Sequence, residues 1–153
     1  MIDEARKMAR PPERGFRFLE HMTDAEIESY GTGLEESFEN AGLAAEETMV
    51  DLSSISQTMK RTIKVSGEDH ESLLYSWLEA LVSLQDIDGM LFSKFSCKIS
   101  KTRGGFELKA SCFGEKYDPK KHEQKTAIKA PTFYQMLIDE KSIPIKIHFI
   151  LDL

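Results

Sequence analysis

The sequence of 153 residues has only two cysteines, and it has no long apolar run. Two cysteines are too few for a disulfide framework or for a zinc site of their own. A transmembrane helix needs about 20 consecutive apolar residues, and no run of the chain comes close to that length. The first fifteen residues also lack the apolar core of a signal peptide. We therefore expect a cytoplasmic protein that makes no contact with a membrane.

Several motifs of nucleotide binding and catalysis are missing as well. There is no GxGxxG sequence, no P-loop and no nucleophile elbow around a serine. Twenty-six acidic residues outnumber twenty basic ones, so the formal net charge is −6. Proteins that coat nucleic acid through their overall field usually carry a basic face. The composition therefore argues against that class of protein, but it is compatible with a partner that itself handles nucleic acid.

The residues that are present indicate an ordinary folded domain. Hydrophobic residues make up 41% of the chain and charged residues 30%, which is typical of a globular protein. The length is that of one domain with a continuous core. Residues 1–15 mix charges with Pro11 and Pro12 and show no hydrophobic period. We predict a flexible N-terminal tail over residues 1–15 and a single domain over residues 16–153.

Two segments have the apolar spacing of helices. Thr32 and Glu35 have the separation of a capping box at the start of the first helix. The second helix has Asp69 as its predicted N-cap, and Gly89 is placed to end it in a left-handed conformation. The apolar stripe of the first helix consists of Leu34, Phe38, Ala41, Ala45 and Met49.

Alternation of apolar and polar residues predicts strands in most of the remaining chain. The predicted strands cover residues 16–20, 25–30, 57–67, 90–100, 106–114, 127–139 and 142–153. In the last of them Ile147, Phe149 and Leu151 share one face, while His148 and Asp152 lie on the other. Two helices together with these strands indicate an α+β fold.

The glycines between two central strands predict a hairpin and a position for both cysteines. If Gly104 and Gly105 form the loop, Cys97 lies directly opposite Cys112. Two buried thiols side by side are the simpler interpretation in a reducing compartment. A conditional cross-strand disulfide is the alternative.

Carboxylates occupy two unusual positions in the chain. Asp24 lies in a polar segment between two predicted strands, and Asp152 is the penultimate residue of a strongly hydrophobic strand. The α-carboxylate of Leu153 adds a third anion directly after Asp152. If these groups meet, a cation is needed to offset their repulsion, and oxygen ligands favour calcium, magnesium or manganese over zinc. An ordinary surface aspartate and a frayed terminus are the alternative reading.

A series of short motifs resembles the archease family over residues 16–153. In chain order the motifs are "FLEHMTDAEI", "YGTGLEESFENA", "GEDHESLLYSWLEAL", "YDPKKH", "KAPTFY" and the terminal "ILDL". Each is modest alone, but their order and spacing together are specific. The resemblance implies an archease-like fold, in which two packed α-helices and a mixed or antiparallel β-sheet form a sandwich-like core.

The resemblance also implies a function. Archeases are accessory proteins of the RtcB-type RNA ligase in tRNA splicing and RNA repair, and they promote its guanylylation by GTP and its multiple turnover. The ligase, rather than the archease, joins the RNA ends. The expected protein is therefore not an enzyme, its partner is the ligase, and its contact with tRNA is indirect.

The resemblance further implies which residues carry this function. A divalent metal is bound in the family by positions that match Asp24, Asp152 and Leu153, and we expect calcium here, with magnesium or manganese as alternatives. Lys129, His21 and His122 also match motif positions and are expected to contact the partner or support the site. The segment "KTAIKAPT" departs from the family pattern, since Pro131 within a strand must lie at an edge or a bulge.

Two other functional classes remain open at this point. One is a small metal-dependent hydrolase that uses Asp24 and Asp152 to hold the ion and His21 or His148 as the base. The other is a chaperone or binding module that does not depend on metal. The basic segment "DPKKHEQK" could contact phosphate, although such a run is more often a solvated loop.

Overall fold

The structure is a computed structural model that describes residues 15–19 and 24–153. The predicted N-terminal tail therefore lies outside the described residues, apart from Gly15. The helices are α2 (Leu34–Met49) and α3 (His70–Asp88), and a short 3-10 turn, η1 (Leu52–Ser54), follows α2. The strands are β1 (Phe16–Leu19), β2 (Asp24–Gly31), β3 (Met59–Gly67), β4 (Met90–Thr102), β5 (Gly105–Lys116), β6 (Ala130–Asp139) and β7 (Ile145–Asp152).

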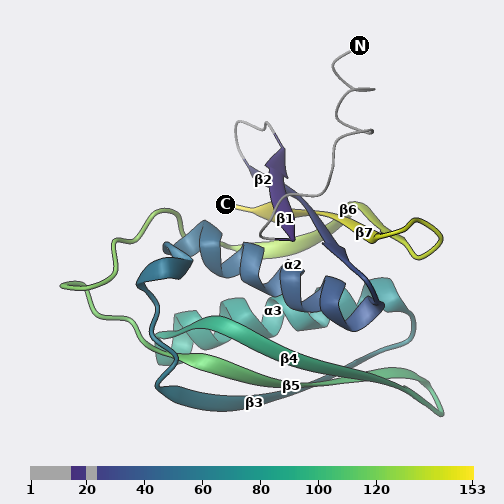
Figure 1. The fold of residues 1–153 in the computed structure, drawn as a ribbon, viewed down its shortest axis with the longest axis horizontal. Helices are drawn as coiled ribbons and strands as arrows, with labels where there is room; N and C mark the ends of the chain where they lie inside the picture. Colours follow the sequence, from purple (N-terminus) through teal and green to yellow (C-terminus); the bar gives the residue numbers. More distant parts are fainter. Residues whose placement is uncertain (1–14, 20–23) are drawn as a thin grey trace.

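The described strands form two antiparallel sheets with the helices between them (Figure 1). One sheet has the order β1-β2-β7-β6 and the other the order β3-β5-β4. Helix α2 contacts β2 and β4, and α3 contacts β3 and β6, so each helix packs on both sheets. The expected α+β sandwich-like fold with two packed helices is confirmed. Each sheet has one face toward the helices and one face toward solvent.

Helix α2 is apolar on the sides that meet the two sheets. Phe38, Ala41, Ala45 and Met49 are buried, as their spacing predicts. Small residues allow the helices to approach closely: a Cβ atom at Gly42 would come within 3.0 Å of Trp77. The predicted capping box is wrong, because Gly33 rather than Thr32 is the N-cap residue and makes no side-chain cap bond.

Glu35, the acidic residue of the predicted capping box, binds the β3-β5-β4 sheet instead of the helix start. The main-chain N–H of Ile99 donates to Glu35 Oε2 at 2.7 Å, and that of Cys97 donates to Glu39 Oε2 at 2.7 Å. Both donors belong to β4, which is an edge strand. Unpaired N–H groups on a sheet edge are a template for further pairing. The glutamates of α2 therefore satisfy the outer edge of β4 and attach that edge to the helix.

Glu46 extends the same pattern into the core. Its Oε1 atom accepts a 2.8 Å hydrogen bond from the N–H of Phe92, next to the irregularity in pairing between Phe92 and Lys94. This irregularity shifts the alternation of β4, so the Phe92 N–H points outward like those of Cys97 and Ile99. Glu46 is fully buried. Its other carboxyl oxygen, Oε2, is buried as well and has no hydrogen-bond partner among the described residues.

Helix α3 begins and ends as the sequence predicts. The Asp69 side chain accepts a 2.7 Å hydrogen bond from the N–H of Ser72, and Gly89 has a φ of 65° in the left-handed region. Leu73, Leu74, Trp77, Leu78 and Leu81 are all fully buried. No helix in the described part of the chain is long and apolar enough to cross a membrane.

The hairpin between β4 and β5 differs from its prediction. Thr102 pairs with Gly105, so the two loop residues are Arg103 and Gly104. This shift by one loop position changes the partners of both cysteines: Cys97 pairs with Ala110 and Cys112 with Phe95. The predicted directly opposite pairing is therefore wrong, and the two cysteines are diagonal neighbours on one face of the hairpin. Both cysteines are free and buried, and burial raises the pKa of the Cys112 thiol to about 12.

The last strands agree with the sequence in their faces and differ in their bounds. Ile147, Phe149 and Leu151 are buried, while His148 and Asp152 point to the other face. β7 begins at Ile145 rather than at residue 142. β6 is an edge strand whose pairing is irregular between Thr132 and Leu137, and this is the setting expected for Pro131.

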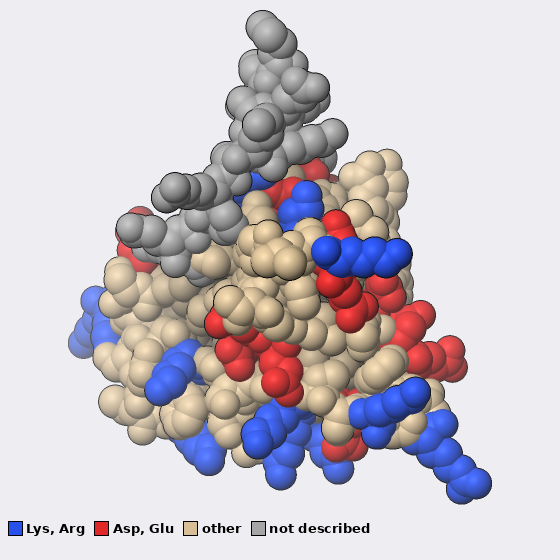
Figure 2. Space-filling view, turned by 45° about the vertical axis from the view of Figure 1, so that its right-hand side comes forward, with Lys and Arg blue, Asp and Glu red and all other residues tan. Residues whose placement is uncertain are grey.

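Charged side chains are unevenly distributed over the surface. Figure 2 shows Lys and Arg side chains gathered along the lower margin of the molecule. Figure 1 places the β3-β5-β4 sheet on that side. A chain with a net charge of −6 thus has a basic region over one sheet.

Buried Glu46 makes the stability of the protein depend on pH. Burial raises the pKa of Glu46 from 4.5 to about 8, against the opposing effect of the Phe92 N–H. Because the folded state keeps this proton at pH values where the unfolded chain releases it, stability is lost as the pH rises from 4.5 to 8. The loss is on the order of 1 kcal/mol for each pH unit of that window.

We expect Glu46→Gln to remove this pH dependence, because glutamine keeps the acceptor for Phe92 and cannot ionise. Urea unfolding at several pH values tests this expectation. The readout is the difference between variant and wild type in the free energy of unfolding. That difference cancels the titration of all other groups, and it should grow in favour of the variant as the pH rises. A difference that does not change with pH would contradict the assignment.

Candidate functional site

The pairing of β2 with β7 brings the two predicted aspartates together. The strands are antiparallel, and Asp24 is the direct partner of Asp152 at one end of the ladder. Directly opposite residues have their side chains on the same face of a sheet, with Cβ atoms about 5 Å apart. Asp152 is exposed and Asp24 is partly exposed. The two carboxylates therefore share one solvent-accessible position at the end of the β1-β2-β7-β6 sheet.

The strand on the other side of β7 adds Lys129 to this position. Ala130 pairs with Asp152, and the N–H of Lys129 donates a 2.8 Å hydrogen bond to the main-chain oxygen of Asp152. Lys129 is exposed, and Leu153 follows Asp152 directly. Four of the six residues predicted from the sequence thus lie together: Asp24, Lys129, Asp152 and Leu153.

The outer face of the same sheet is acidic beyond the aspartate pair. Glu26 and Glu28 follow Asp24 at every second position of β2, so all three lie on one face. Glu28 bonds to Arg17 Nη2 at 2.6 Å and to the hydroxyl of Tyr30 at 2.8 Å. Burial would raise the pKa of Glu28, but these partners outweigh it and lower the pKa. This acidic series was missed in the sequence, although the alternation Asp24, Glu26, Glu28 is visible there.

His148 completes the acidic face and is held by two acceptors. One ring nitrogen, Nδ1, lies 2.7 Å from the main-chain oxygen of Gln135, and the other, Nε2, lies 2.5 Å from Glu26 Oε2. Both nitrogens of the ring are therefore engaged within the sheet. A histidine held in this way has no free nitrogen with which to take a proton from a water molecule.

The donor set at the aspartate pair fits a hard divalent cation. Like charges directly opposite in a sheet repel each other. A cation between them attracts both carboxylates and offsets this repulsion. Carboxylate oxygens are the ligands that calcium, magnesium and manganese prefer. Within residues 15–19 and 24–153, no three His, Cys, Asp or Glu side chains are grouped so that they could hold a metal. Two side-chain carboxylates would therefore need main-chain oxygens or water to complete the coordination, as is common for these ions.

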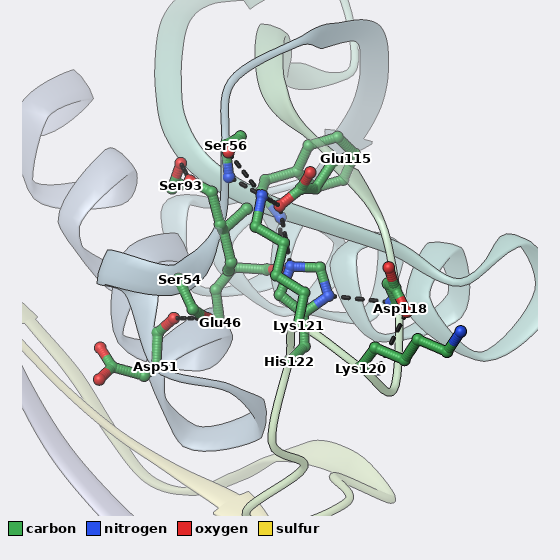
Figure 3. A network of polar contacts seen from close by, with 12 residues as sticks. Glu46, Asp51, Ser54, Ser56, Ser93, Glu115, Asp118, Lys120, Lys121 and His122 are labelled. Carbon is green, nitrogen blue, oxygen red and sulfur yellow. Dashed lines mark hydrogen bonds and ion pairs between the residues drawn. The ribbon is translucent and has the colours of Figure 1, made fainter.

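His122 lies in a separate network on the other sheet (Figure 3). Its side chain is buried, its Nδ1 accepts a 2.9 Å hydrogen bond from the N–H of Asp118, and its Nε2 lies 2.8 Å from Glu115 Oε2. Because Nδ1 is an acceptor here, Nε2 carries the proton and donates to the carboxylate. Lys121 also pairs with this carboxylate at 2.7 Å. These contacts fix the loop after β5 to the strand.

Several hydrogen bonds converge on Glu115 and change its pKa. Burial alone would raise the pKa of this carboxyl, but hydrogen bonds from Lys121, the Ser56 N–H and His122 lower it to about 2. The basic segment over residues 118–125 is thus partly engaged in structural ion pairs. Contact between His122 and a partner stays a prediction. His21 lies outside the described residues.

Comparisons with known proteins show the family to which this chain belongs. Residues 16–153 match the model of the Archease protein family (MTH1598/TM1083). The chain is 44% identical over 121 residues to the protein archease of Pyrococcus abyssi, covering 79% of this chain and 85% of the relative. It is 42% identical over 138 residues to that of Sulfurisphaera tokodaii, covering 90% of this chain and 98% of the relative.

A solved structure matches the architecture as well. The solution structure of Methanobacterium thermoautotrophicum protein 1598 superposes with a TM-score of 0.80 at 40% sequence identity. The match covers 92% of this chain and 99% of that chain. The chain is a small α+β protein in which two aspartates meet at one end of a sheet. The chain belongs to the archease family.

We expect calcium to stabilise the protein through the aspartate pair. A ligand at about 100 times its Kd stabilises the folded state by about 2.7 kcal/mol, which corresponds to a rise in Tm of roughly 5 to 10 °C for a domain of this size. Asp152→Asn should remove this rise, and without calcium it should be no less stable than the wild type because one of two facing charges is gone. Thermal unfolding with calcium chloride and with a chelator measures both effects.

Asp86→Asn is the matched control, because it removes one exposed negative charge from α3 and leaves β2 and β7 unchanged. It should keep the full response to calcium. The same rise in Tm in all three proteins would show that calcium acts elsewhere on the acidic surface.

Proposed function

We propose that this protein is an accessory protein of an RtcB-type RNA ligase, and that it promotes the GTP-dependent guanylylation and the multiple turnover of that ligase in tRNA splicing and RNA repair. The observation that carries the proposal is the pairing of Asp24 with Asp152 in a chain that belongs to the archease family. The joining of RNA ends is left to the ligase. We place this activity in the cytoplasm.

The part of the protein that would act on the ligase is a rigid metal-binding site, which we call the tip and which consists of Asp24, Lys129, Asp152 and Leu153. Asp24, Asp152 and Leu153 would hold a divalent ion, most suitably calcium, with magnesium or manganese as alternatives. When bound, the ion supplies positive charge that can attract phosphate or carboxylate groups of the partner. Lys129 lies beside Asp152 and adds a further positive group at the same tip. The backbone hydrogen bonds of three neighbouring strands keep these residues in place.

The tip would act on the ligase by favouring one of its conformations. A protein that binds the GTP-accepting form more tightly than the resting form shifts the population toward it, and a few kcal/mol of differential affinity is enough. This action needs no nucleophile and no acid–base pair in the accessory protein. It is consistent with a site built from carboxylates and a lysine.

The contacts of His148 argue against its use as the base of a metal-dependent hydrolase. A hydrolase of this type needs a base within reach of a water on the metal. Both ring nitrogens of His148 are engaged by Gln135 and Glu26, while His21, the other candidate base, lies outside the described residues. We accordingly expect the purified protein to turn over no phosphoester.

The proposed role can be tested by measuring guanylylation of the purified ligase with GTP and divalent ion in the absence of RNA. Asp24→Ala should reduce the stimulation by roughly tenfold or more, which is the usual cost of losing a metal-site residue. Asp86→Ala, which removes an exposed acid from α3, should stimulate like the wild type. Unchanged stimulation by Asp24→Ala would contradict the role of this site and favour a binding module that does not depend on metal.

A further inference from the structure

The β3-β5-β4 sheet has an outer face that the helices do not cover. Helices α2 and α3 lie against its inner face (Figure 1), where Ile63, Leu108 and Cys97 are buried. Side chains at alternate positions therefore point to solvent. We name this surface the lysine face, because five of its exposed residues are lysines: Lys60, Lys64, Lys94, Lys98 and Lys109.

The register places three of these lysines in one row across the sheet. Lys109 of β5 pairs with Lys64 of β3 on one side and with Lys98 of β4 on the other. Neighbouring strands are about 4.8 Å apart, so three positive charges lie directly side by side. Like charges at directly opposite positions destabilise a sheet. This row therefore costs the free protein stability, and an anion bound to it would remove that cost.

The neighbouring rows supply an aromatic ring and hydroxyl groups. Phe113 lies between Lys60 and Lys94, and Lys94 Nζ is 5.4 Å from the centre of its ring. The row between Phe113 and the lysine row consists of Thr62, Ser111 and Ser96. The face thus combines positive charge, hydrogen-bonding hydroxyls and one aromatic surface.

The acids on this face leave its charge positive. Glu107 lies 3.6 Å from Lys64, and Glu115 is already bound to Lys121 and His122 at the end of β5. Five lysines thus face these two glutamates, although the chain as a whole has a net charge of −6. The basic lower margin in Figure 2 is the side of the molecule on which this sheet lies.

We propose that the lysine face binds a single-stranded segment of RNA, with lysines on its phosphates and Phe113 as a stacking platform for a base. Charge complementarity indicates a polyanion, and an exposed sheet with lysines around an aromatic residue suits single strands, whose phosphates and base faces are both accessible. That this polyanion is RNA rests on the proposed function. The inference replaces the expected indirect contact with RNA by a direct one, on the sheet opposite the aspartate pair.

The test measures binding of a fluorescein-labelled single-stranded RNA of roughly 12 nucleotides, a length within the range of single-strand sites, by fluorescence anisotropy without the ligase. The variant is the triple substitution Lys64→Gln, Lys98→Gln and Lys109→Gln. We expect it to weaken binding at least about tenfold at low salt. It should also reduce the slope of log K against log salt by about 2, because each phosphate contact on a single strand contributes about 0.7.

The matched control is the triple substitution Lys116→Gln, Lys120→Gln and Lys141→Gln. These three lysines are exposed and lie outside the rows described above, and the change in net charge is the same. The control should bind RNA within about threefold of the wild type and keep its salt dependence. Because the lysine row is repulsive, the first triple variant should have a Tm equal to or above that of the wild type, so weakened binding cannot be attributed to unfolding.

Two results would overturn the inference. One is equal binding of RNA by both triple variants, which would leave only the overall charge as the cause. The other is binding of polyglutamate as tight as that of RNA, with no effect of Phe113→Leu on RNA affinity, which would make the face a site for an acidic protein surface. The proposed function is tested separately by guanylylation without RNA, so a failure of either test leaves the other interpretable.

Discussion

The position of β7 between β2 and β6 is the constraint on which the functional end of the molecule depends. Its apolar residues Ile147, Phe149 and Leu151 are buried on the side of the sheet that contacts α2, and a slip by one residue would turn all of them toward solvent. The core therefore fixes the register, and the register fixes Asp24 opposite Asp152 with Lys129 alongside. Two like charges are held together by hydrophobic burial elsewhere in the same strand.

Helix α2 has a comparable role for the second sheet. It is buried between both sheets, and Glu35, Glu39 and Glu46 each accept a hydrogen bond from an N–H of β4. Acidic residues on a central helix thus act as acceptors for the edge of a sheet. The free-energy cost of burying a charged carboxylate is largest at Glu46, where burial raises the pKa to about 8.

Much of the fold and of the site could be predicted from local patterns, and the remainder depended on contacts between distant segments. Asp69 and Gly89 bound α3 as predicted, because caps are local. The predicted capping box of Thr32 and Glu35 is wrong, because Glu35 instead accepts a hydrogen bond from the N–H of Ile99, 64 positions further along the chain. The cysteine pairing failed because one loop position changes the register of a whole hairpin. Asp24 and Asp152 could be linked through the family resemblance, but their direct pairing, the His148–Glu26 contact and the lysine row required the register of the sheets.

The three carboxylates on the edge of β4 also bear on how the molecule can assemble. Growth of a sheet by strand addition begins at main-chain groups that are ready to pair. At Phe92, Cys97 and Ile99 those groups already have acceptors, and an incoming strand would have to leave the acidic side chains of α2 without these donors. Extension of this sheet into a fibre or a swapped dimer is thereby disfavoured on the β4 side, so the lysine face gains no further strand there.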